Sequence, residues 1–212
     1  MVLCGRKWGG VTEGGEEPRS YARLALVRHG RSAHEHRGWV DHAGFAKWRE
    51  AYEAAGIAEG QRPPAALVDL TARARVVLSS DAPRALSSAR ALAPSHQVVA
   101  SPLLRELDLE GPRILGLRLP LPAWALAVGC RMLLLSLRGR YPSASEALRV
   151  REAVAWLETV VMQHSLTIVM THASVRSQIA KALLASGWQA EVGSRTTRHW
   201  SAWLMSRRIT MQ

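Results

Sequence analysis

The sequence predicts an α/β fold with a mostly parallel central sheet that is covered by helices on both faces. Short apolar runs alternate along the chain with longer segments of helical periodicity. Several of these runs are apolar on both faces, as the strands of a covered parallel sheet are. The chain has 212 residues and is 48% hydrophobic, so it can bury the core of one domain of ordinary size.

Five apolar runs are predicted strands, and four segments are predicted helices. The strands are expected at 24–28, 75–79, 97–100, 166–171 and 200–206, the last of which alternates in polarity as an edge strand does. The helices are expected at 43–55, 83–92, 144–164 and 174–186.

Turn and cap residues set the expected ends of these helices. Gly56 and Gly187 end two of them. Pro83 stands in the first turn of the 83–92 helix, where proline is tolerated, and Asp81 or Ser80 is expected to cap that helix. We expect the chain to enter the 144–164 helix through Ser145.

One apolar segment, LPLPAWALAVGCRMLLLSLRGR at 119–140, is close in length to a membrane span. Pro120 and Pro122 open it and Arg131 interrupts it, and an arginine near the centre of a bilayer is costly. The sequence therefore predicts no membrane partner. It favours a buried helix or an apolar lid over a pocket, at about 114–138.

The N-terminal residues differ in composition from the rest of the chain. Residues 1–20 are rich in glycine and charge and lack the apolar core of a signal peptide, so we expect a flexible extension before a single domain at 21–212. The two cysteines, Cys4 and Cys130, lie in this extension and in an apolar run, and they do not predict a disulfide framework. We therefore expect a cytoplasmic protein.

The charge balance favours anionic partners. The formal net charge is +11, from 28 Lys and Arg against 17 Asp and Glu, and most of the cations are arginines. Arginine presents a planar fork that matches the oxygens of phosphate and carboxylate. A nucleic-acid surface is not expected, because no recognised motif is present and the chain has one Phe and three Tyr for stacking on bases.

Polar side chains follow the predicted strands where each of them ends. Ligands of open α/β sheets bind beyond the carboxyl ends of the strands. The residues expected at this edge are Arg28 and His29 after the first strand, Ser79, Ser80 and Arg84 after the second, Glu106 after the third, and Thr171 and His172 after the fourth.

This set of side chains is suited to phosphoryl transfer through a histidine. A neutral imidazole nitrogen can attack phosphorus and hold the phosphoryl group covalently. Arginines and a second imidazole can stabilise the charge on the phosphoryl oxygens. A carboxylic acid is needed to protonate the leaving oxygen and then to activate water. Glu106 is the candidate for this acid, and Glu110 is its rival.

Four segments of the sequence resemble the signatures of the histidine phosphatase superfamily, the phosphoglycerate mutase-like proteins. They are LVRHGRS, SSDAPRALSSA, LLRELDLEG and VMTHASVRSQIAKALL, and the resemblance runs from about residue 22 to the C-terminus. It implies a three-layer α/β/α fold and a reaction that needs no cofactor and no metal.

The resemblance also implies a role for each matching residue. His29 matches the residue that becomes phosphorylated, and Glu106 matches the proton donor of branch 1 of the superfamily. Arg28, Arg84 and His172 match the rest of the phosphate pocket. The remaining positions that we expect to contact substrate are Gly30, Ser32 and Ala173.

The sequence departs from the family pattern at several positions. Glu35 stands where the family often has Asn, and Ala173 stands where a glycine is usual. The ERHYG string of phosphoglycerate mutases is absent around Glu106, and Ser32 directly follows Arg31, which breaks the pattern of the acid phosphatase branch. These departures favour a phosphatase of branch 1 over a mutase.

Several alternatives to this prediction remain open. A non-catalytic or degenerate phosphate-binding protein on the same fold would bind phosphate without turnover. The cluster of His34, Glu35, His36, Asp41 and His42 has an H-x-H spacing that could bind a divalent ion, which would make the protein a metallohydrolase. Under the main prediction, the apolar 114–138 segment indicates a small phosphorylated substrate with an apolar portion.

Overall fold

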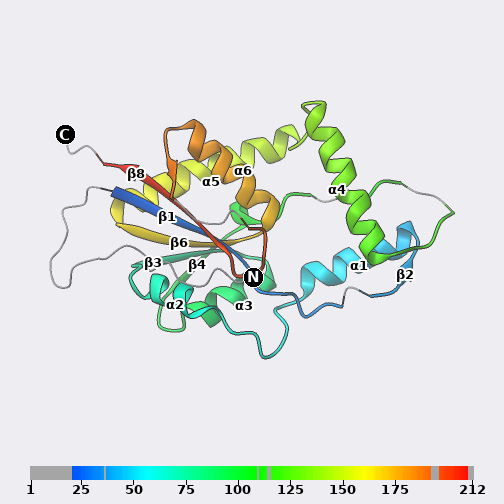
Figure 1. Cartoon of the computed structure of the whole chain (residues 1–212), viewed down its shortest axis with the longest axis horizontal. Coiled ribbons are helices and arrows are strands. Elements are labelled where there is room, and N and C mark those ends of the chain that lie inside the picture. Colours follow the sequence, from blue (N-terminus) through cyan, green and yellow to red (C-terminus); the bar gives the residue numbers. More distant parts are fainter. Residues whose placement is uncertain (1–20, 36, 109, 114–115, 192–195, 210–212) are drawn as a thin grey trace, which may run out of the picture.

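The central sheet of the protein is mostly parallel, as the sequence predicts. The computed structural model describes residues 21–35, 37–108, 110–113, 116–191 and 196–209, so the predicted extension at 1–20 lies outside the described residues. Six strands pair in the order β4-β3-β6-β1-β8-β7 (Figure 1). Neighbouring strands from β4 to β1 are parallel, and β8 is antiparallel to both β1 and β7. Their bounds are β1 Tyr21–Arg28, β3 Val76–Ser80, β4 Val98–Ser101, β6 Leu166–Thr171, β7 Gln189–Ala190 and β8 Ala202–Arg208.

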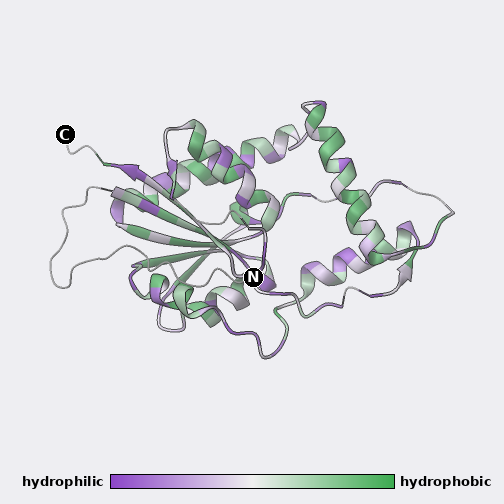
Figure 2. Ribbon diagram, in the orientation of Figure 1, coloured by the Kyte–Doolittle hydropathy of each residue, from purple (hydrophilic) through white to green (hydrophobic). Residues whose placement is uncertain are grey.

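Helices cover both faces of this sheet because alternate strand residues point to opposite faces. Leu24 and Leu26 of β1 pack with α5 (Ala144–Gln163) and α6 (Ala173–Ala185) in one core cluster. Ala25 and Val27 pack in a second cluster with α2 (Ala65–Ala72) and α3 (Pro83–Leu92). The strands of the sheet are largely hydrophobic in Figure 2, as these two-sided cores require. The result is the three-layer α/β/α arrangement.

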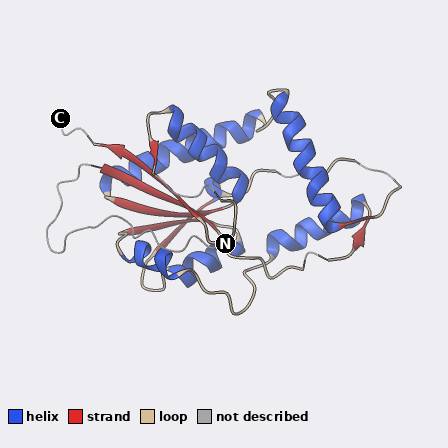
Figure 3. Cartoon of the chain, in the orientation of Figure 1, coloured by secondary structure: helices blue, strands red, loops and turns tan. Residues whose placement is uncertain are grey.

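A smaller unit lies beyond the carboxyl ends of the parallel strands (Figures 1 and 3). It contains α1 (His42–Ala54), α4 (Leu121–Leu137) and a short sheet of β2 (Trp39–Val40) and β5 (Leu119–Pro120). A separate core cluster joins α1 to α4 and consists of Phe45, Leu121, Trp124 and Val128. This unit forms the outer wall of the cavity described below.

The apolar segment predicted at about 114–138 contains a largely exposed helix. The alternative of a buried helix, which the sequence allowed, is wrong. Residues 114–115 lie outside the described residues, and α4 follows from Leu121. Leu126, Leu133, Leu134 and Leu137 are each more than half exposed, while Trp124 of the same helix is fully buried. No helix in the described part of the chain combines the length and apolarity that a membrane crossing needs.

Local capping differs from the sequence-based expectation at two helices. Ala82, and neither Asp81 nor Ser80, is the N-cap of α3, and no side chain caps that helix. Asp81 pairs instead with Arg105, at 2.6 Å. Ser143, and not Ser145, caps α5, where its side chain and that of Glu146 form a reciprocal capping box.

The last strand also differs from the expectation. β8 lies between β1 and β7, so it is not an edge strand. The short elements α2, β2, β5 and β7 and the 3-10 turn η1 (Pro102–Leu104) were not predicted. Each spans eight residues or fewer, which leaves little periodicity to read.

Candidate functional site

The parallel pairing of β1 with β6 brings the two predicted histidines together. The two strands end in register, with Arg28 opposite Thr171. The N–H of His29 donates to the carbonyl of Thr171 at 3.0 Å, which extends the ladder by one residue. His29 and His172 therefore leave neighbouring strands at the same edge of the sheet.

The imidazole rings of His29 and His172 face each other edge to face. Their centroids lie 4.9 Å apart at an interplanar angle of 62°. Both rings are buried, with exposed fractions of 1% for His29 and 0% for His172. His29 Nδ1 lies 2.6 Å from the carbonyl oxygen of Gly30, which accepts a hydrogen bond from it. In this tautomer His29 Nε2 carries the lone pair and is the nitrogen that can attack an electrophile.

Burial keeps both imidazoles neutral. The pKa of His29 is lowered to about 3, chiefly because burial penalises the charged ring, and Arg84, Arg28 and His199 add repulsion. The hydrogen bond to Gly30 opposes this shift only in part. The pKa of His172 also lies well below its ordinary value, because of burial first and then of Arg84 and His29. At neutral pH His29 is therefore uncharged.

Three buried polar atoms around these rings have no hydrogen-bond partner among the described residues: Arg28 Nε, Arg84 Nε and His172 Nδ1. His172 Nε2 lies 2.9 Å from Ser80 Oγ, and that oxygen already accepts from the N–H of Ala82. The Ser80 hydroxyl can therefore donate to Nε2, which leaves Nδ1–H as a donor. Three unpaired buried donors around the histidine pair fit the oxygens of a tetrahedral oxyanion.

Arg28 and Arg84 are held by different parts of the chain. Arg28 Nη1 donates to the carbonyl of Thr197, in the loop before β8. Arg84 lies in the first turn of α3 and is fully buried. Its two terminal nitrogens lie 3.1 and 3.0 Å from the carboxylate oxygens of Glu53, at the end of α1. Both guanidinium groups are thus fixed beside the histidine pair.

Glu106 is anchored at the N-terminus of α6, directly after His172. Its Oε1 accepts hydrogen bonds from the N–H groups of Ser174, Val175 and Leu107 and from the Ser174 hydroxyl. All four bonds go to Oε1, so Oε2 is the oxygen left for proton transfer. Arg149 donates to the Glu106 carbonyl at 3.1 Å and holds this loop in place.

The two other carboxylates of this loop, Asp108 and the rival acid Glu110, are held in ion pairs. Asp108 pairs with Arg49 of α1 at 2.7 Å. Glu110 pairs with Arg131 of α4 at 3.4 Å and lines a separate cavity of about 380 Å³ with His42. Of the three carboxylates in this loop, Glu106 is the one that contacts the helix behind His172.

The three small residues predicted at the site have clear backbone roles. The N–H of Gly30 donates to Ser88 Oγ at 2.9 Å, and a Cβ at Gly30 would lie 2.7 Å from the Trp200 ring. Ser32 Oγ accepts from the N–H of His34 at 3.1 Å. Ala173 is the first residue of α6. Contact of Gly30, Ser32 and Ala173 with a substrate stays a prediction.

Sequence reasoning missed several residues that build the site. His199 lies 3.1 Å, through Nδ1, from the carbonyl of His29, and the two rings are 5.5 Å apart. Arg176 is fully buried and holds the loop before β8 through the carbonyls of Ser201 and Thr196, at 2.7 and 3.0 Å. Arg176 follows His172, the N-cap of α6, by four residues, and this spacing places the two residues near each other. The spacing was the signal in the sequence from which Arg176 could have been predicted.

The histidine-rich segment after the nucleophile does not form a metal site among the residues described, which contain no group of three or more such ligands. The ring of His34 lies 5.4 Å from that of Trp48. Asp41 caps α1 by accepting from the N–H of Gly44 at 2.8 Å. His36 lies outside the described residues.

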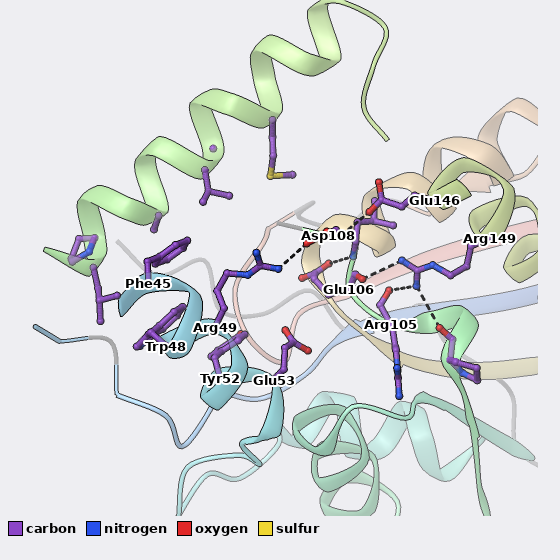
Figure 4. A pocket seen from close by; sticks show the side chains of 18 residues that line it. Phe45, Trp48, Arg49, Tyr52, Glu53, Arg105, Glu106, Asp108, Glu146 and Arg149 are labelled. Carbon is purple, nitrogen blue, oxygen red and sulfur yellow. Dashed lines mark hydrogen bonds and ion pairs between the residues drawn. The ribbon is translucent and has the colours of Figure 1, made fainter. Parts of the chain in front are cut away.

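A cavity of about 890 Å³ lies between α1, α4 and the loop that carries Glu106 (Figure 4). Its volume is within the range that holds a small-molecule ligand. The α1 and α4 walls are mostly apolar, whereas the opposite wall carries charged residues that include Glu106, Asp108, Glu146 and Arg149. Two of its lining residues connect it to the histidine site: Glu53 binds Arg84, and Glu106 binds the backbone of Ser174, two residues after His172. His29, His172, Arg28 and Arg84 are not among the residues that line the cavity.

Comparisons with known proteins establish the fold. No protein-family model and no curated protein matches the sequence. Two solved structures, Mycobacterial hydrolase 2 and Mycobacterial hydrolase 1, superpose with a TM-score of 0.54 each, at 17% and 19% identity. The alignments cover 90% of this chain in both cases and 90% and 97% of those chains. The alpha-ribazole phosphatase from Shigella flexneri is also similar, with a TM-score of 0.43 and 17% identity over 76% of this chain and 79% of that one. The fold shared with the two mycobacterial structures is the α/β fold with a mostly parallel sheet.

Substitution by alanine should change stability in opposite directions at Gly30, which packs against Trp200, and at Gly129, which has open space around it. We expect Gly30→Ala to lower the free energy of unfolding by about 1–3 kcal/mol, because its Cβ would overlap a packed ring. Gly129→Ala lies within α4 with no atom near its Cβ, and we expect it to raise local helix stability by about 0.5–1 kcal/mol. Urea denaturation of both variants measures this difference, and equal effects would contradict the packing at Gly30.

The lowered pKa of His29 predicts that stability falls in mild acid. The folded-state pKa of about 3 lies below the unfolded value, so the unfolded chain takes up a proton that the folded chain does not. The contribution of His29 is complete above its unfolded pKa and is lost progressively as pH falls from that value to the folded pKa of about 3. From His29 alone, the free energy of unfolding should be about 2 kcal/mol lower at about pH 5 than at about pH 7.5.

Urea denaturation across this pH range, on the wild type and His29→Asn, measures the effect. The variant should show a shallower dependence on pH than the wild type, because asparagine takes up no proton in either state. A slope in His29→Asn equal to that of the wild type would show that His29 is not buried in its neutral form.

Proposed function

We propose that the protein is a metal-independent phosphomonoesterase of the histidine phosphatase superfamily that acts through a phosphohistidine at His29. The observation that carries this proposal is the buried pair of neutral imidazoles, 4.9 Å apart, beside two arginines. The name hydrolase that the two mycobacterial structures carry agrees with it. We also propose, from the sequence, that the enzyme works in the cytoplasm.

The first half of the reaction transfers the phosphoryl group to the protein. His29 Nε2 attacks phosphorus, a P–N bond forms, and the bond from phosphorus to the leaving oxygen breaks. Arg28, Arg84 and His172 hold the three oxygens that carry the charge of the transition state. Glu106 gives a proton to the leaving oxygen, which departs as a neutral alcohol.

The second half returns the protein to its starting state. Water attacks the phosphorus of the phosphohistidine while Glu106 takes a proton from that water. The P–N bond breaks, inorganic phosphate is released, and His29 is again neutral. The hydrogen bonds that fix Glu106 Oε1 at the first turn of α6 support this role, because they leave Oε2 of the same carboxylate for both proton transfers.

The cavity supports a small phosphorylated substrate with an apolar portion. Phe45, Trp48, Leu121 and Met132 line it on the side of α1 and α4, next to the two carboxylates that adjoin the phosphoryl site. In this proposal the leaving group occupies the cavity (Figure 4). The exposed helix α4 then serves as the lid that we expect over about 114–138.

The phosphoenzyme predicts a chemical signature. After brief incubation with p-nitrophenyl phosphate, mass spectrometry of the quenched wild type should detect phosphate on His29 that is stable in alkali and labile in acid. His29→Ala should form no adduct and should lose turnover, while a chelator should leave the turnover of the wild type unchanged.

Two outcomes would contradict the proposal. An enzyme that binds phosphate but shows neither adduct nor turnover on several phosphomonoesters would be a phosphate-binding protein on this fold. Turnover that a chelator abolishes would place a metal ion in the reaction.

The separate positions of Glu106 and Glu110 predict different effects of removing each acid. Glu106→Gln should lower kcat/KM for an alkyl phosphate by roughly 10²–10⁴-fold, the usual range for a lost general acid. The loss should be smaller for p-nitrophenyl phosphate, whose leaving group needs no proton. Glu110→Gln is the matched control and should stay close to the wild type, because Glu110 pairs with Arg131 in a separate cavity. Similar losses in both variants, measured by steady-state kinetics, would remove Glu106 from the role of acid.

A further inference from the structure

The last turn of α1 holds the guanidinium of Arg84 from two directions. The carboxylate of Glu53 binds both terminal nitrogens, at 3.1 and 3.0 Å. The ring of Tyr52 covers one face of the guanidinium, with Arg84 Cζ 4.4 Å from the ring centroid. The carbonyl of Tyr52 accepts a further hydrogen bond from Nη1 at 3.4 Å. No other described residue forms a hydrogen bond with the guanidinium of Arg84.

These contacts use one edge of the guanidinium and leave the other edge unpaired. Glu53 occupies the edge formed by Nη1 and Nη2, while Nε is buried and has no hydrogen-bond partner. A guanidinium can bind an oxyanion at either edge, because each presents two N–H groups in parallel. The Glu53 side chain is 55% exposed and lines the cavity, so it approaches Arg84 from the cavity side. Arg84 also lies close enough to His29 and His172 to lower the pKa of both rings.

A stack of aromatic rings fixes the position of Tyr52. The Tyr52 ring stacks on Trp48 at 5.3 Å between centroids, and Trp48 stacks on Phe45 at 5.9 Å. Phe45 in turn stacks on Trp124 of α4 at 4.8 Å, and the angle between these two planes is 9°. The ladder therefore runs without a break from Trp124 of α4 to the guanidinium of Arg84.

We propose that Glu53 and Tyr52 are positioning residues of the phosphoryl site, which orient Arg84 so that its Nε edge faces the phosphoryl oxygens. This inference rests on the proposed function. A buried arginine without a counterion is costly, so Glu53 also keeps Arg84 in place when no anion is bound. Glu53 does not compete with phosphate, because the two anions use opposite edges of the same guanidinium.

The test compares Glu53→Gln with Glu50→Gln, an exposed carboxylate one turn earlier on the same helix. Isothermal titration calorimetry with inorganic phosphate measures the affinity of the site for phosphate and does not depend on turnover. Glu53→Gln should weaken phosphate binding roughly tenfold, the ratio that one hydrogen bond to a charged group accounts for, and should raise KM for p-nitrophenyl phosphate by a similar factor. Glu50→Gln should match the wild type in both measurements.

Two results would overturn the inference. Tighter phosphate binding in Glu53→Gln would show that Glu53 competes with phosphate for Arg84. Unchanged phosphate affinity together with a lower melting temperature would show that Glu53 acts only in stability. These two results can be told apart from a failure of the proposed function. If the wild type binds phosphate but has no turnover, the phosphate affinities of the wild type and the variants can still be compared.

A second pair of variants tests the stacking on Arg84. Tyr52→Phe keeps the ring that covers the guanidinium, and Tyr52→Leu removes it. The phenylalanine variant should keep phosphate affinity within about threefold of the wild type, and the leucine variant should lose it by roughly fivefold, in line with the energy of a partly buried cation–π contact. Equal losses in the two variants would assign the effect to the hydroxyl group and overturn the role of the ring.

Discussion

The parallel pairing of β1 with β6 determines where the candidate site of this protein lies. Because Arg28 lies opposite Thr171, the residues that follow both strands leave the sheet side by side. A shift of one residue in this register would send one imidazole to the other face of the sheet. β6 is buried along its whole length, and β1 alternates between the two core clusters. The register that builds the cores therefore also places His29 against His172.

Burial of the histidine pair has an electrostatic cost that the surrounding residues offset. Two imidazoles and the guanidinium of Arg84 lie in a buried environment, where cations are destabilised. The imidazoles meet this cost by staying neutral, as the lowered pKa values of His29 and His172 require. Arg84 meets it through the carboxylate of Glu53. The same burial that weakens the charged form of His29 thus gives a free lone pair on Nε2 at neutral pH.

The sheet and most of the candidate site could be predicted from the sequence, because their signals are local. An apolar run followed at once by Arg28 and His29 marks a strand end, and the pattern repeats before His172. His199 and Glu53 carried no such signal. His199 reaches His29 because β8 is antiparallel to β1, which brings the start of β8 to the end of β1. Glu53 reaches Arg84 because α1 lies beside α3, and neither neighbour can be inferred from a pattern within one segment. The choice between a buried helix and a lid at α4 stayed open for a related reason, since its composition shows an apolar helix but not how much of it another element covers.

Helix α1 takes part both in the cavity and in the surroundings of Arg84. On one side its aromatic rings form part of the cavity wall and stack onto Trp124 of α4. On the other side its last turn contacts Arg84 through Glu53 and the Tyr52 ring. A group bound in the cavity would therefore pack against the same helix that contacts Arg84. Helix α4 contributes Leu121, Trp124 and Val128 to the core of this unit, and its Met132 packs against that core. Under the proposed function, a change at these contacts reaches Arg84 through the stacked rings, so α1 and α4 influence both which leaving group fits and how firmly the phosphoryl group is held.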